Sequence, residues 1–273
     1  MSRKLTLEEL NRVKESIEAK EQFEIGLTQA CNANDSFAQR IKSKLVPSID
    51  YQSHFATKFL ARISPTLKDS LEAKINQSTI NPAELGNLRQ RNPNIDTLFN
   101  LLQKHFFSEF QKGKLEPIHG DPAPDNFMTI NDELHPGDRE LMYLQGKPQF
   151  SLWTLLGNLI PNSELRKENQ DQLLAFSFEE RYGKITPQNQ SEFEEYKRVY
   201  HKVDLYQSIL HVARCLDGIK ALKPENAKQI YEYVQKSLRE EKLSDLADSL
   251  EQVMKGYLTK ESKSAFYPEI VIE

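Results

Sequence analysis

The sequence is poor in cysteine and in long apolar stretches, and each scarcity excludes a class of protein. Its 273 residues include two cysteines, Cys31 and Cys215. Two are too few for a disulfide framework or a cysteine zinc site and suit a reducing compartment, so we expect a cytoplasmic protein. No apolar run approaches the ~20 residues that a membrane helix needs, and the N-terminus lacks the apolar core of a secretory signal. We therefore expect no membrane partner.

An excess of positive charge is also absent. The chain has 36 Lys and Arg against 40 Asp and Glu, which gives a formal net charge of −4. Such a balance creates no field that would recruit nucleic acid, so we expect no nucleic-acid partner. With 38% hydrophobic and 28% charged residues, the composition is polar but is that of a folded protein with one large domain or two small ones.

Most of the chain has the periodicity of helices. Thr6 and Glu9 have the spacing of a capping box ahead of an apolar stripe that runs from residue 5 to residue 17. Further helices are expected at about residues 35–45, 82–88, 94–113, 163–182, 186–217, 224 onward and 244 onward. Asn94 is the expected N-cap of the helix at residues 94–113, and Gly183 follows the end of the helix at residues 163–182.

The sequence pattern changes after residue 113, where it predicts short extended segments instead of helices. Residues 115–118 look like one such segment. Residues 127–130 and 141–144 look like two strands of a hairpin, joined by a turn that includes Pro136 and Gly137. The polar stretch at residues 76–94 is the best candidate for an internal boundary.

One segment carries a chemical pattern: residues 118–128, which read IHGDPAPDNFM. It places Asp121 two residues after His119, and Asn126 five residues after Asp121. Protein kinases have this spacing in their catalytic loop, where Asp accepts the proton of the substrate hydroxyl and Asn holds magnesium. The short loop keeps the two groups at a fixed separation, as phosphoryl transfer requires.

The same residues resemble the HGDxxxxN motif of the aminoglycoside phosphotransferase family, which is related to choline kinase and other small-molecule kinases. The predicted helix before the motif, the hairpin after it and the helices of residues 178–206 are similar to that family's C-terminal lobe, over roughly residues 95–258. The resemblance implies that Asp121 is the catalytic base, that His119 braces the loop, and that Asn126 binds Mg²⁺ together with ATP.

The sequence departs from the family at the second metal ligand. The family has an Asp at the end of the strand after the hairpin, and Tyr143 stands at about that place here. Asp138, twelve residues after Asn126, is the acid whose spacing fits best, and Glu140 and Asp132 are poorer substitutes. Magnesium prefers octahedral oxygen ligands, usually carboxylates and phosphates, so we take Asn126 and Asp138 as the candidate ligands for the metal and its nucleotide.

A second departure concerns the N-terminal lobe, which in a kinase is a twisted sheet with a phosphate-covering loop and a lysine on a strand. Residues 1–113 are helical by pattern, and their glycines are isolated (Gly26, Gly86 and Gly113). Three alternatives stay open: a C-terminal lobe whose other half is lost, a degenerate kinase used for binding, or a helical segment that replaces the usual lobe.

The motif also has an explanation without chemistry, as a Pro- and Asp-rich turn in which Asp121 caps backbone groups and Asn126 is a turn residue. We nevertheless expect a mainly α protein with a small β-hairpin, in which a helical region, residues 1–93, precedes a kinase-like C-terminal lobe, residues 94–273. The leading function is ATP-dependent phosphoryl transfer to a hydroxyl of a small molecule or a protein. The alternative is an inactive pseudokinase that binds a protein partner through its N-terminal helices.

Overall fold

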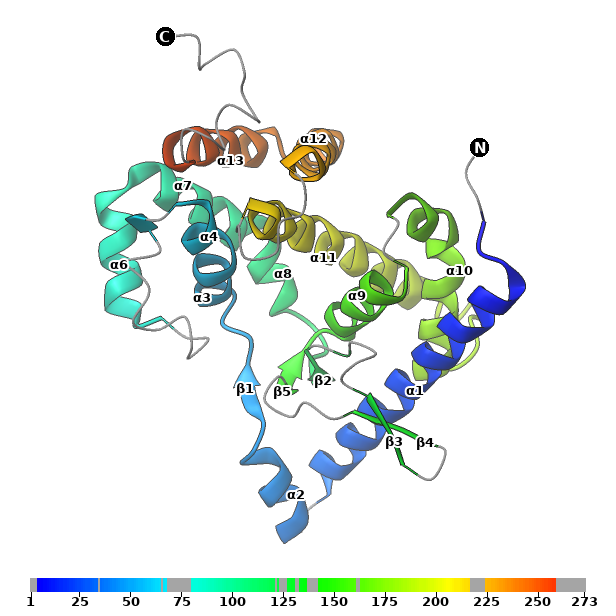
Figure 1. Cartoon of the computed structure of the whole chain (residues 1–273). Coiled ribbons are helices and arrows are strands. Elements are labelled where there is room, and N and C mark those ends of the chain that lie inside the picture. Colours follow the sequence, from blue (N-terminus) through cyan, green and yellow to red (C-terminus); the bar gives the residue numbers. More distant parts are fainter. Residues whose placement is uncertain are drawn as a thin grey trace. The chain divides into compact units, whose positions relative to one another are not determined.

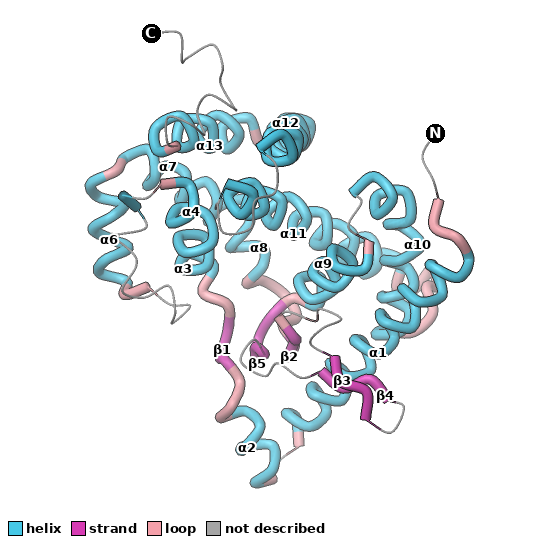
Figure 2. Tube along the Cα trace, in the orientation of Figure 1, coloured by secondary structure: helices cyan, strands magenta, loops and turns pink. Residues whose placement is uncertain are grey.

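A computed structural model of the chain describes residues 4–33, 35–64, 66–67, 80–120, 122, 127–130, 133–136, 142–160, 163–216 and 224–258. The described elements are mostly helices, with five short strands (Figures 1 and 2). Contacts divide the chain into two units, one formed by Met1–Ile49 and Phe110–Val203 and the other by Asp50–Glu109 and Asp204–Glu273. The division expected from sequence, at residues 93 and 94, rests on the kinase resemblance and stays a prediction.

The first unit combines long helices with all of the described strands. Its helices are α1 (Leu7–Asn32), α2 (Ser36–Lys42), α9 (Pro148–Leu159), α10 (Ser163–Tyr182) and the first part of α11 (Gln190–Leu216). The capping box at the start of α1 is confirmed, because Glu9 N–H donates to Thr6 Oγ1 at 3.2 Å and Thr6 N–H donates to Glu9 Oε2 at 2.8 Å. The end of α10 before Gly183, whose φ is 86°, is also confirmed.

The strands form two separate sheets. β1 (Val46–Ser48), β5 (Met142–Gly146) and β2 (Glu116–His119) form the first, in the order β1-β5-β2. β1 is parallel to β5, with Val46 opposite Tyr143, and β2 is antiparallel to β5, with His119 opposite Met142. β3 (Phe127–Ile130) and β4 (Glu133–Pro136) form the second sheet as an antiparallel pair.

The strand predicted at residues 141–144 is confirmed as β5, but the prediction that it forms a hairpin with residues 127–130 was wrong. Residues 127–130 pair with β4, and Pro136 belongs to β4 instead of to the turn. Only two residues, Asn131 and Asp132 in the sequence, separate the paired Ile130 and Glu133. Both residue types favour tight turns. Pro136 and Gly137 are a stronger turn signal, and the predicted turn was therefore placed there.

The apolar core of the first unit lies among α1, α9, α10 and α11. Val13 and Ile17 of α1 are buried in one cluster with the following side chains: Leu152, Leu155, Leu156, Leu173, Leu174, Phe178, Tyr196 and Tyr200. Helix α1 also contacts β2. The N-terminal helix thus contributes to the core of the first unit and lies against β2, the strand that leads into the predicted motif, which we call the motif strand.

The second unit contains helices and no strand among its described residues. It contains α3 (Tyr51–Phe55), α4 (Ala61–Ile63), α6 (Pro82–Arg91), α7 (Pro93–Leu102), α12 (Pro224–Glu240), α13 (Ser244–Tyr257) and the end of α11. π-helical turns, η1 (Ala56–Leu60) and η3 (Gln103–Phe107), extend α3 and α7, and a short helix, α8 (Ser108–Phe110), follows η3. The prediction of Asn94 as an N-cap was wrong, because Asn92 holds that position and Pro93 begins the helix, where its missing N–H costs nothing.

An aromatic cluster packs the second unit around Tyr206, which is fully buried. Its ring meets those of Phe107 and Tyr51 edge-on, with centroids 5.7 and 6.4 Å apart. The Tyr206 hydroxyl lies 3.0 Å from His54 Nδ1, so its polar end is paired inside the cluster.

The coarse fold class expected from sequence is confirmed: the chain is mainly α with little β structure. Among the described residues up to 113, only Val46–Ser48 form a strand, so the expected helical character of this region holds for the part described. In the described ranges, no helix is both long enough and apolar enough to cross a membrane. The kinase-like architecture stays a prediction.

Candidate functional site

The predicted motif begins at the end of β2. His119 is the last residue of this strand and is 1% exposed, and Gly120 follows it. The predicted base Asp121 and the predicted magnesium ligands Asn126 and Asp138 lie outside the described residues. Of the four predicted site residues, the structure therefore places His119, and the roles of the other three stay predictions.

Strand β2 is a tightly packed support for the loop. All four of its residues are buried, and Ile118 is 0% exposed. A Cβ added to Gly146 on β5 would lie 2.3 Å from Ile118 Cδ1 and 2.6 Å from its Cγ1. Because real contacts are never so short, Gly146 is needed to let the motif strand lie against β5.

The backbone of His119 is held by a side chain from the N-terminal helix. Its N–H donates to Glu24 Oε1 of α1 at 3.0 Å, across 95 residues of sequence. The imidazole lies edge-on to Phe23, the residue before Glu24, with the ring centroids 6.3 Å apart. The first residue of the motif is thus fixed through both its backbone and its ring.

The second oxygen of Glu24 is held by two cations. Glu24 Oε2 lies 2.6 Å from Arg181 Nη2 and 3.1 Å from Lys20 Nζ, and all three side chains are at most 2% exposed. Burial alone would lower the pKa of Arg181, but the carboxylates around it, above all Glu24 and Glu21, outweigh burial and raise the pKa. The guanidinium therefore stays charged.

Arg181 also contacts two further buried carboxylates. Its Nε lies 3.3 Å from Glu21 Oε2 of α1 and 3.4 Å from Glu116 Oε2 of β2. Lys20 Nζ lies 2.9 Å from Glu21 Oε1. We call Lys20, Glu21, Glu24, Glu116 and Arg181 the Arg181 network.

Hydroxyl groups surround this network. Ser177 Oγ donates to Glu21 and lies 2.9 Å from the Tyr196 hydroxyl, while the Tyr182 hydroxyl donates to Glu116 Oε2 at 3.4 Å. Burial is the main cause that raises the pKa of Tyr182 and of Tyr196, so both phenols stay protonated. They act as neutral hydrogen-bonding groups in this environment.

Sequence reasoning missed the Arg181 network, although α1 carries a signal for it. Lys20, Glu21 and Glu24 continue the helical spacing of the apolar positions Val13 and Ile17, so they fall on the face that the core buries. Charged side chains on a buried face are rare unless they are paired. Their partner Arg181, however, lies far along the chain and cannot be identified from spacing.

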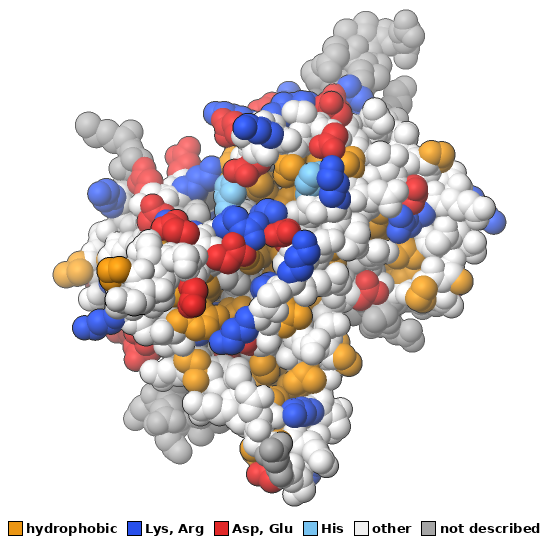
Figure 3. Space-filling view, turned by 180° about the vertical axis from the view of Figure 1, so that it is seen from behind, with side chains coloured by type: hydrophobic (Ala, Val, Ile, Leu, Met, Phe, Trp, Pro, Cys, Tyr) orange, Lys and Arg blue, Asp and Glu red, His pale blue; other side chains and the backbone are white. Residues whose placement is uncertain are grey.

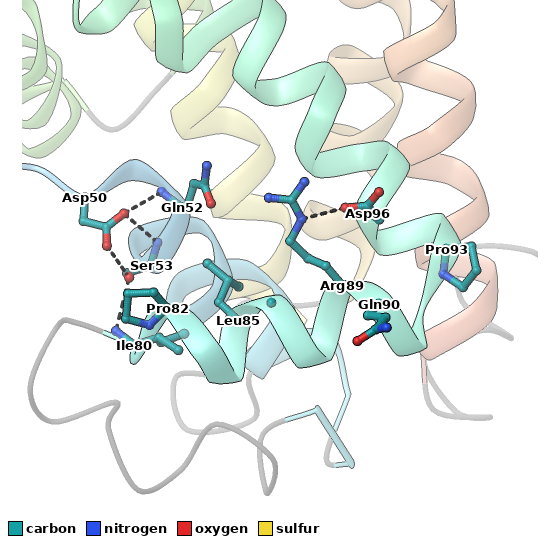
Figure 4. Close-up of a pocket in the computed structure, with 11 residues that line it drawn as sticks. Asp50, Gln52, Ser53, Ile80, Pro82, Leu85, Arg89, Gln90, Pro93 and Asp96 are labelled. Atoms are coloured by element: carbon teal, nitrogen blue, oxygen red, sulfur yellow. Dashed lines mark hydrogen bonds and ion pairs between the residues drawn. The ribbon is translucent and has the colours of Figure 1, made fainter.

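A cavity of about 570 Å³ in the second unit is the other candidate site (Figure 4). Asp50 and Ser53 lie at one end, and Arg89 and Asp96 lie at the other. Asp50 accepts hydrogen bonds from the N–H groups of Gln52 and Ser53, and Arg89 Nε donates to Asp96 Oδ1 at 2.7 Å. Because its charged groups are used within the protein, nothing in the cavity indicates a particular ligand.

In the part of the chain that the structure describes, no group of three His, Cys, Asp or Glu side chains has the arrangement of a metal site. On the face shown in Figure 3, Lys and Arg side chains are interspersed with Asp and Glu, as the composition implies. Comparison of the chain with protein-family models, curated proteins and solved structures finds no match. The resemblance to the aminoglycoside phosphotransferase family therefore stays an interpretation of the motif.

Proposed function

We propose that the chain is an ATP-dependent phosphotransferase of the aminoglycoside phosphotransferase type, acting on a hydroxyl of a small molecule or a protein. One observation carries the proposal. His119, which the resemblance makes the brace of the catalytic loop, is buried at the end of β2 with its N–H held by a buried carboxylate. A plain surface turn needs no such support, whereas a loop that must place a base and a metal ligand within a fraction of an ångström does.

In the proposed reaction, the substrate hydroxyl oxygen attacks the γ-phosphorus of ATP, and a new O–P bond forms as the bond to the β-phosphate oxygen breaks. Asp121 accepts the hydroxyl proton, and ADP leaves. Asn126 and Asp138 would hold Mg²⁺, which would offset the negative charge of the phosphates. Catalysis then depends on positioning and charge, so the rigidity of the strand before the loop bears directly on it.

Thermal unfolding with and without Mg·ATP tests the proposal. At ten times its Kd, a ligand adds about 1.4 kcal/mol to the free energy of unfolding. In a chain of this size that raises Tm by about 3–6 °C. We expect this shift in the wild type and in the control Asn11→Ala, an exposed position on α1, and expect it to be absent in Asn126→Ala. No magnesium-dependent shift at millimolar ATP would contradict the proposal.

A second candidate is a pseudokinase that binds a protein through its N-terminal helices. The observation that favours it is the exposure of two large apolar side chains there, Leu7 at 75% and Phe37 at 61%. The same experiment separates the two, because a pseudokinase of this kind shows no Mg·ATP shift. Its partner binding, unlike nucleotide binding, would weaken in Phe37→Ser.

A further inference from the structure

The Arg181 network places five charged side chains in the interior of the first unit. Lys20 is 1% exposed, Glu21 and Glu24 are 0% exposed, and Glu116 is 6% exposed. Removing charges from water is costly, and replacing a buried ion pair by apolar side chains of similar volume is often neutral or stabilising. Stability alone therefore does not explain why three carboxylates and two cations gather beside the motif strand.

The contacts of the network converge on both ends of β2. Glu116 is the first residue of the strand, and Arg181 contacts its carboxylate directly. It reaches the last residue indirectly, because Glu24 Oε2 binds the guanidinium while Glu24 Oε1 accepts the N–H of His119. One guanidinium is thus connected to both ends of the strand that leads into the motif.

We propose that Glu24 is a positioning residue for this loop, acting through the backbone of His119. The inference rests on the proposed function, since it concerns the same motif. Asp121 is two residues beyond His119 in the sequence, so the proposal requires that a displacement of the His119 backbone changes the position of the proposed base. A displacement of about 1 Å at a reacting group is enough to lower a rate about a hundredfold.

Binding measurements on matched variants test the inference. Glu24→Gln keeps the shape of the side chain but removes the charge that holds Arg181 and Lys20. Glu15→Gln makes the same change at an exposed position on α1, and Ser177→Ala removes a buried partner of Glu21 that does not contact His119. We expect Glu24→Gln to weaken Mg·ATP binding about 10- to 100-fold, as loss of an outer ligand support does, and expect both controls to stay within about twofold. Equal affinity in Glu24→Gln and the wild type, or an equal loss in Ser177→Ala, would overturn the inference.

Amide hydrogen exchange without nucleotide gives a readout that does not depend on the proposed function. We expect the His119 amide to exchange about tenfold faster in Glu24→Gln, because a charge-assisted hydrogen bond is weakened. Because Glu24→Gln also removes a member of the buried charge network, amides of α11 report the general loss of stability, and the His119 amide should be accelerated more than they are. An unchanged His119 rate would remove the positioning role. A faster rate in a protein that fails to bind Mg·ATP would instead refute the proposed function and leave the support by Glu24 in place.

Discussion

At the scale of single residues, His54 shows how burial controls protonation. Its Nδ1 lies 3.0 Å from the Tyr206 hydroxyl inside the second unit. Burial, followed by the nearby charges of Lys58 and Arg62, lowers the pKa of His54 from 6.5 to about 4, although Asp50 acts in the opposite direction. The folded protein therefore keeps this imidazole neutral at pH values where an unfolded chain protonates it.

This difference predicts a pH dependence of stability. Above pH 6.5 the contribution of His54 is fully present, and it is lost as the pH falls toward 4, because only the unfolded state takes up the proton there. A shift of about 2.5 pKa units corresponds to at most about 3–4 kcal/mol. We predict that His54→Gln, measured by urea unfolding between pH 4 and 7, has a shallower loss of stability than the wild type. Parallel curves for the two proteins would show that His54 does not titrate in this way.

Gly146 is a second residue whose replacement has a definite expected effect. A Cβ at this position overlaps the buried Ile118 side chain of the motif strand. We predict that Gly146→Ala lowers the free energy of unfolding by about 1–3 kcal/mol through overpacking. Gly26→Ala on α1, where a Cβ meets nothing within 4 Å, should stabilise by up to about 1 kcal/mol. Chemical unfolding of both variants measures these changes in the free energy of unfolding. If Gly146→Ala left it unchanged, β2 would be able to shift and accommodate the methyl group without loss of stability.

At the scale of elements, the Arg181 network joins α1, β2 and α10. Removing one member of a buried charge cluster leaves its partners uncompensated. We predict that Arg181→Leu loses about 3–5 kcal/mol of stability. Arg198→Leu removes an exposed arginine that pairs with Glu195 three residues away, and should lose less than about 1 kcal/mol. Equal losses for the two variants in denaturant unfolding would contradict a special role for Arg181.

Local signals predicted the elements better than their pairing. The capping box of Thr6 and Glu9, the helix that begins at Pro82 and the end of α10 before Gly183 follow from residues close together in sequence. The pairing of β3 with β4 and of β5 with β1 and β2 does not. Strand partners depend on contacts between distant segments, and short strands carry little pattern with which to identify them.

In the candidate site too, local features could be predicted from the sequence, whereas contacts between distant segments could not. The spacing of His119, Asp121 and Asn126 is local, so the motif could be recognised from sequence. Its support could not, because Glu24 lies 95 residues before His119 and Arg181 lies 157 residues after Glu24. Charges on the buried face of α1 indicated that some partner existed, but only the folded chain shows which one.

At the scale of the whole molecule, the two candidate sites belong to different units. The motif strand, its support by α1 and the Arg181 network belong to the unit formed by Met1–Ile49 and Phe110–Val203. The aromatic cluster, His54 and the 570 Å³ cavity belong to the other. Helix α11 continues from one unit into the other.

Isothermal titration of the full chain with Mg·ATP tests the central claim, that residues 119–126 form a nucleotide site, most directly. We predict a single binding event with one nucleotide per chain, abolished in Asn126→Ala, abolished when EDTA removes the magnesium, and retained in Asn11→Ala. No heat of binding up to millimolar nucleotide, or the same isotherm in Asn126→Ala as in the wild type, would contradict it.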